Sequence, residues 1–142
     1  MTMLSQLLDL KGHDVYSVKP DTAVIEAIRV MAERHVGALL VLEGNRLVGI
    51  VSERDYARKV VLLGRSSDST PVRDIMTTPV LTIEPDGTVD DAMRLMTERR
   101  IRHLPVVRSG GVVGIVSIGD LVKSVIEEQR HTIEDLRSYI QG

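Results

Sequence analysis

The chain has 142 residues, a formal net charge of −2 at pH 7 and no cysteine. A chain of this length corresponds to one domain with a sizeable core, and the lack of cysteine excludes disulfides and thiolate metal sites. The small net charge gives no bulk attraction to nucleic acid or to an anionic membrane, and a cysteine-free composition fits the reducing cytoplasm, where we expect the protein to be.

An internal repeat sets the order of the predicted elements. A shift of 65 positions aligns residues 15–60 with residues 80–125 without a gap, and 18 of the 46 pairs are identical. Two copies this similar are expected to form one pseudo-symmetric unit, in which each half buries an apolar face against the other.

The first copy is predicted to hold a short strand, an amphipathic helix, a hairpin and a second helix. Apolar residues at i, i+3, i+4 and i+7 from Val24 indicate the first helix, and Gly44-Asn45 between two apolar runs indicates the hairpin. Gly64 is expected to end the second helix. In chain order the predicted elements are residues 15–18, 24–31, 39–42, 47–51 and 53 to about 63.

The second copy is predicted to repeat this β-α-β-β-α order. Thr88 and Asp91 have the spacing of a capping box at the start of its first helix, and the last helix is expected to continue toward Tyr139. Its strands are expected at residues 80–83, 104–107 and 112–116. The predicted division is residues 1–64 for the first repeat with its N-terminal segment, 65–71 for a linker, 72–126 for the second repeat and 127–142 for a helical extension.

Each copy contains the same short motif where a strand is expected to run into a helix. Residues 49–55 read GIVSERD and residues 114–120 read GIVSIGD. In both, a serine is followed three residues later by an aspartate. This S-x-x-D spacing is also that of a capping box, which needs no ligand, so capping and ligand contact are both open interpretations of the motif.

The ordered set P-D, A-h-x-x-M, L-x-V and G-I-V-S-x-x-D, where h is apolar, resembles the CBS motif in both copies. Two such motifs in tandem resemble a CBS pair, or Bateman module, and the similarity covers nearly the whole chain. The resemblance implies an α+β fold of two packed β-α-β-β-α repeats. It also implies a stand-alone regulatory protein that binds AMP, ADP, ATP, NAD or S-adenosylmethionine in clefts between the repeats and that forms homodimers.

In the family, each site combines the first strand and the helix-to-strand loop of one repeat with the S-x-x-D turn of the other. One expected site is therefore Ser17, Val36, Gly37 and Ala38 with Ser117 and Asp120. The other expected site is Thr82, Arg102, His103 and Pro105 with Ser52, Arg54 and Asp55.

The two expected sites differ in charge. The first helix-to-strand loop has no arginine to match Arg102, and Gly119 stands where the first turn has Arg54. We therefore expect the site with Thr82, Arg102 and Asp55 to bind a phosphorylated ligand more strongly. In both sites the aspartate would accept hydrogen bonds from the ribose cis-diol, and the serine with free helix N–H groups would hold phosphate oxygens.

Other functional classes find little support in the sequence. His13, His35, His103 and His131 form no ligand pair of metal-site spacing, and the basic run ERRIRH lacks interleaved aromatic residues. No nucleophile elbow, P-loop, HExxH or GxGxxG motif is present, so we expect no enzyme, no metal and no catalytic cofactor. No apolar run approaches the ~18 residues that a membrane span needs.

The sequence therefore predicts a sensor that couples an adenine nucleotide, AMP first and NAD second, to conformation or to binding of a regulated partner. Because phenylalanine and tryptophan are absent, the adenine ring would lie between aliphatic side chains. The alternative is a structural or dimerisation module with vestigial clefts. The apolar face of Leu121, Val122, Val125 and Ile126 is the expected dimer seam.

Overall fold

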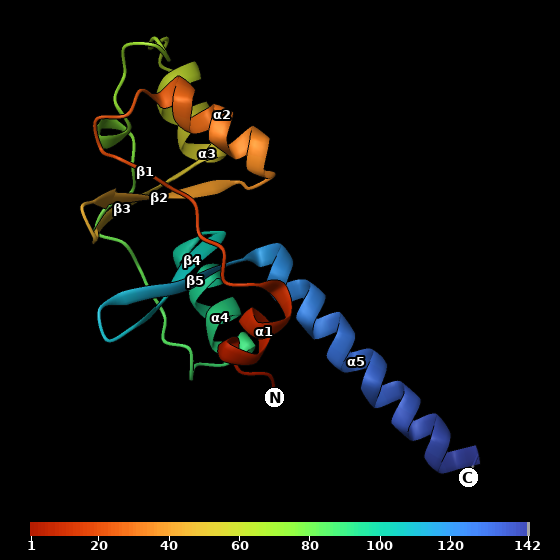
Figure 1. Ribbon diagram of the computed structural model, residues 1–142. Coiled ribbons are helices and arrows are strands. Elements are labelled where there is room, and N and C mark those ends of the chain that lie inside the picture. The colour runs from red at the N-terminus through yellow and green to blue at the C-terminus, as the bar shows by residue number, and fades with distance from the viewer. Residues whose placement is uncertain (142) are drawn as a thin grey trace. The chain divides into compact units, whose positions relative to one another are not determined.

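The computed structural model describes residues 1–141 and shows an α+β chain with two compact units (Figure 1). The first, Val15–Val80, is called here the N-repeat unit. The second, called the C-repeat unit, combines Met1–Asp14 with the described residues 81–141. The mixture of helices and strands in two repeats confirms the predicted fold class.

The N-repeat unit is built on a three-stranded sheet in the order β1-β2-β3. β1 is parallel to β2, and β2 is antiparallel to β3. Its elements in chain order are β1 (Ser17–Val18), α2 (Val24–Arg34), β2 (Ala38–Glu43), β3 (Arg46–Ser52), α3 (Glu53–Tyr56), the π-helix η1 (Ala57–Val61) and the 3₁₀-helix η2 (Val72–Asp74).

Helical periodicity determines which face of α2 is buried. Val24, Ala27 and Met31 are buried and pack with Leu39 and Val41 of β2. The outer edge of β3 is closed by the backbone of Thr77, which donates to the Ile50 carbonyl at 2.8 Å and accepts from the Ile50 N–H at 3.1 Å. The unit thus satisfies part of its sheet edge with its own later backbone.

The C-repeat unit has the same plan with one strand reduced. Its elements are α1 (Leu4–Lys11), α4 (Val89–Arg99), β4 (His103–Arg108), β5 (Gly111–Ser117) and α5 (Ile118–Gln141). β4 and β5 are antiparallel, and Ile83 alone bridges Val106 in parallel. The predicted strand 80–83 is therefore wrong beyond one residue. In the N-repeat unit the Leu40 N–H donates to the Tyr16 carbonyl, but the residue that matches Leu40 is Pro105, which has no N–H to donate to Leu81.

The helix α1, which the sequence analysis did not predict, belongs to the C-repeat unit (Figure 1). Leu4, Leu7 and Leu8 are buried in its core. Leu8 lies over Gly114, where an added Cβ would come within 2.6 Å of Leu8 Cδ2. The N-terminal segment therefore packs with the second repeat. The repeat boundaries predicted from the sequence mark where each copy of the repeat begins and ends, and not which segments pack together. They stay a prediction.

The final helix α5 is continuous over 24 residues, as predicted. Leu121 is fully buried in the core and Val125 packs against it, so the predicted dimer seam is wrong in including Leu121. Apolar side chains farther along α5 are exposed: Val122, Ile126, Ile133, Leu136, Tyr139 and Ile140. Among the helices of residues 1–141, none combines the length and apolar character needed to cross a membrane.

Candidate functional site

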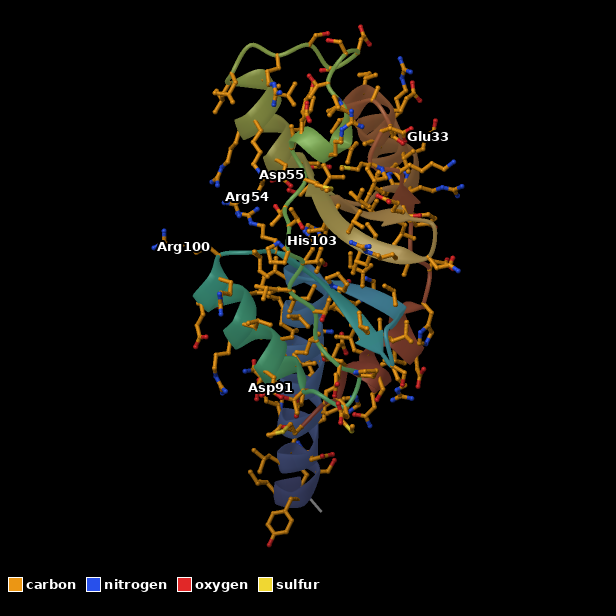
Figure 2. All side chains as sticks on the ribbon, turned by 90° about the vertical axis from the view of Figure 1, so that its left-hand side faces the viewer. Glu33, Arg54, Asp55, Asp91, Arg100 and His103 are labelled. Atoms are coloured by element: carbon orange, nitrogen blue, oxygen red, sulfur yellow. The ribbon has the colours of Figure 1, made fainter. Side chains whose placement is uncertain are left out.

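The first S-x-x-D turn joins β3 to α3 through a closed capping box. The Ser52 N–H donates to Asp55 Oδ2 at 3.0 Å, and the Asp55 N–H donates to Ser52 Oγ at 3.2 Å. Figure 2 shows Arg54 and Asp55 at this helix start. The aspartate is therefore part of the local fold, whatever else it binds.

The second turn has the same geometry. The Ser117 N–H donates to Asp120 Oδ2 at 2.8 Å, and the Asp120 N–H donates to Ser117 Oγ at 3.1 Å. Both side chains are part-buried. The capping interpretation of the motif is thus confirmed at both turns, and ligand contact by the same aspartates stays a prediction.

The helix-to-strand loop of each repeat lies beside the S-x-x-D turn of the same repeat. The Glu53 N–H donates to the Gly37 carbonyl at 3.1 Å, and at the matching position the Ile118 N–H donates to the Arg102 carbonyl at 2.8 Å. Within each unit, this brings together the loop and turn residues that the sequence singled out. The strand pairing agrees, since Ala38 lies opposite Ser52 and His103 lies opposite Ser117.

These hydrogen bonds reduce the number of helix N–H groups available to a ligand. The first and third N–H groups of the helix after each turn are bonded to the loop carbonyl and to the serine hydroxyl. The expectation of a free set of donors at the helix start is therefore wrong for two of the first three. At most the N–H groups of Arg54 and Gly119 stay available in those first three positions.

A lysine outside the motif pairs with each aspartate. Lys59 Nζ lies 3.1 Å from Asp55 Oδ1, and the Thr77 hydroxyl donates to the same oxygen at 3.4 Å. Lys11 Nζ, at the end of α1, lies 2.7 Å from Asp120 Oδ2. Each turn therefore contains a carboxylate with an ammonium partner from its own unit.

At the second turn, the pKa values of Asp120 and His103 are both lowered. Burial acts to raise the pKa of Asp120, but hydrogen bonds from Lys11 and from the Ser117 N–H outweigh it and lower the pKa below its ordinary value. Burial and the charge of Lys11 lower the pKa of His103, against an opposing contribution from Asp120. At neutral pH His103 therefore presents a neutral imidazole, which can form hydrogen bonds but adds no positive charge to the expected site.

Comparison with known proteins identifies the family. The CBS domain family model matches residues 9–62 and 72–127. This chain belongs to the CBS domain family. It is 47% identical over 127 residues to CBS domain-containing protein CBSX3, mitochondrial, from Arabidopsis thaliana; the match covers 86% of this chain but only 62% of the plant protein.

Solved structures agree on the fold. A putative signal-transduction protein with CBS domains from Burkholderia ambifaria is 51% identical, with a TM-score of 0.87 over 90% of this chain and 96% of that one. The CBS domain pair of protein MJ0100, solved with 5′-methylthioadenosine and S-adenosyl-L-methionine, has a TM-score of 0.80 over 90% of this chain and 98% of that one. At 24% identity this second likeness concerns the fold alone.

The remaining predicted residues lie on strands and loops of their own repeats. Ser17 is an exposed residue of β1, and Thr82 is exposed next to the single bridging residue Ile83. Arg102 is exposed in the loop before β4, and Pro105 is buried within β4. Each expected site combines residues of both repeats, so the assembly of these residues into two sites stays a prediction.

Three polar residues that contact the two aspartates were not predicted from the sequence. Lys59 follows Asp55 by four positions, and this spacing on a helix is a recognisable signal for an ion pair. Thr77 and Lys11 gave no such local signal, since they are 22 and 109 positions from the aspartates that they contact. Only the folded units bring these groups together.

Proposed function

We propose that this chain is a regulatory CBS pair that binds an adenosine-containing ligand and converts occupancy into a change of conformation or of affinity for a partner protein. The observation that carries the proposal is the duplicated turn. Two equivalent strand-to-helix turns each hold a part-buried carboxylate through the same pair of hydrogen bonds. The MJ0100 CBS pair, which shares the fold, was solved with two adenosine-containing ligands, and we extend that ligand class to this chain as part of the proposal.

The chemistry of the turn suits a ribose. A carboxylate with one oxygen fixed by the backbone is rigid, and a cis-diol is a natural bidentate donor to such a group. The hydrogen bonds and ion pair that residues 1–141 give to Asp120 all go to Oδ2, which leaves Oδ1 for a ligand. At Asp55 both oxygens have partners, so a ribose there would displace Lys59 or the Thr77 hydroxyl.

In the finer form of the proposal the ligand is an adenine nucleotide, AMP first and NAD second. The site that uses Asp55 would draw its positive charge from Arg102 and Arg54, with His103 as a neutral hydrogen-bonding group. The site that uses Asp120 would rely on Ser17 and the uncharged loop from Val36 to Ala38. We propose no catalytic role for either site.

Isothermal calorimetry with AMP, ADP, ATP, NAD and S-adenosylmethionine tests the proposal. Loss of charge-assisted hydrogen bonds to a ribose should weaken binding at least about tenfold in Asp55→Ala and Asp120→Ala at their respective sites. Asp91→Ala is the matched control, because Asp91 forms the same capping box with Thr88 at the start of α4, outside the S-x-x-D turns (Figure 2). Equal binding by wild type and the double variant would contradict the assignment.

A second candidate function is an interaction module without a ligand. The observation that favours it is the exposed apolar face of α5, including Ile133 and Leu136. Binding of none of the five ligands, together with stable self-association or capture of a defined partner, would support this candidate. Nucleotide that co-purifies with the protein would argue against it.

A further inference from the structure

Lys11 is a cation at the Asp120 turn that neither expected site includes. It is the last residue of α1, and its ammonium donates to Asp120 Oδ2 and to the backbone carbonyl of Ile115. Its side chain is 33% exposed and that of Asp120 is 24% exposed. The pair is therefore anchored in the C-repeat unit but still accessible to solvent and to a small molecule.

The position of Lys11 is fixed by the packing of α1. Leu4, Leu7 and Leu8 are buried, and the helix ends with a 2.7 Å hydrogen bond from the Gly12 N–H to the Leu8 carbonyl. Because Lys11 lies between these buried leucines and the hydrogen-bonded Gly12, the position of its backbone is well defined. Its ammonium carries three donors, and residues 1–141 provide acceptors for two of them.

The motif of the Asp120 turn contains no cationic residue, and Lys11 supplies a positive charge there from outside the motif. The first turn carries Arg54 where the second has Gly119, and the loop 36–38 expected to face Asp120 is uncharged. Without Lys11, a phosphorylated ligand at this turn would approach a carboxylate with no cation beside it. With Lys11, the carboxylate is neutralised and a donor stays available to an anionic group of the ligand.

We propose that Lys11 is a specificity-determining residue, which makes the Asp120 site accept anionic adenosine ligands and disfavour cationic ones. This inference rests on the proposed function, since it concerns the charge preference of that same site. Lys59 is not its equivalent, because Lys59 follows Asp55 on the same helical segment and accompanies a motif that already carries an arginine.

The test separates charge selection from a merely structural role. In an Asp55→Ala background, which isolates the Asp120 site, calorimetry compares Lys11→Met and Lys11→Arg with the parent for three ligands: AMP, neutral adenosine and cationic S-adenosylmethionine. We expect Lys11→Met to weaken AMP about tenfold, to leave adenosine within about twofold and not to weaken S-adenosylmethionine. Lys11→Arg should keep the order of the parent protein.

The outcomes are distinct. An equal loss for all three ligands, or no change for AMP, would overturn the charge-selecting role of Lys11, while the proposed function of binding an adenosine-containing ligand would still stand. Absence of binding of all three ligands to the wild-type protein would overturn this inference, and the proposed function would be overturned only if ADP, ATP and NAD also fail to bind. Melting curves of both lysine variants identify any loss of folding, and Lys11→Gln, which also removes the charge, replaces Lys11→Met if that variant is unstable.

Discussion

The packing of α1 against the second repeat leads to a quantitative prediction for Leu8→Ala. Leu8 is fully buried, and its Cδ2, Cδ1 and Cγ atoms would lie 2.6, 2.9 and 3.3 Å from a Cβ placed on Gly114. The leucine thus fills space that Gly114 leaves open, and the glycine has no side chain to close the cavity. Large-to-small changes at such sites cost about 2–5 kcal/mol. We expect about 3 kcal/mol and a melting temperature lower by on the order of 10 °C.

The matched control is Leu10→Ala on the same helix. Leu10 is 91% exposed, so its truncation should change the free energy of unfolding by less than about 0.5 kcal/mol. Urea denaturation followed by circular dichroism measures both variants. Hydrogen exchange should localise the effect of Leu8→Ala to peptides of β4 and β5, with β2 and β3 little changed. A cost below about 1 kcal/mol for Leu8→Ala, or equal costs for the two variants, would refute the packing of α1 described above.

Two further predictions concern pH and self-association. A hydrogen bond to the Val113 carbonyl, with the nearby Asp9 carboxylate, raises the pKa of His13. The protonated imidazole therefore stabilises the fold below the ordinary histidine pKa of about 6.5, and this stabilisation is lost as the pH rises through the raised value. The melting temperature of His13→Gln should therefore approach that of wild type as the pH rises; a constant difference would contradict this. Ile133→Asp with Leu136→Asp, both exposed on α5, should weaken dimers in sedimentation without lowering the melting temperature of dilute protein, whereas unchanged dimers would exclude this face as the seam.

Much of each repeat could be predicted because its signals are local. Helical periodicity identified α2 and α4, the Gly44-Asn45 turn identified the first hairpin, and the Thr88–Asp91 spacing identified a capping box that the structure confirms. The S-x-x-D turns were found for the same reason. Their capping role depends on atoms three residues apart, and short-range geometry of this kind is largely set by the sequence.

The missed features all depend on contacts between distant segments. Leu4, Leu7 and Leu8 have helical spacing, but nothing local indicates that α1 packs with the second repeat and not the first. The pairing of Lys11 with Asp120 follows from that packing and was missed with it. The strand expected at residues 80–83 also failed at a distant contact, since β-prone residues are not enough where the neighbouring strand has Pro105 in place of a backbone donor.

The same long-range contacts make the two turns chemically different despite their identical capping geometry. Ile50 and Ile115 occupy matching positions on β3 and β5. The Ile50 backbone is paired with that of Thr77, whereas the Ile115 carbonyl accepts a hydrogen bond from the Lys11 ammonium. One repeat thus closes its strand with neutral backbone and takes its ammonium from Lys59 on the adjoining helical segment, whereas the other takes its ammonium from the distant helix α1. Because a ligand senses charge near its ribose and phosphate groups, two copies of one motif can prefer different ligands without any change in the motif itself.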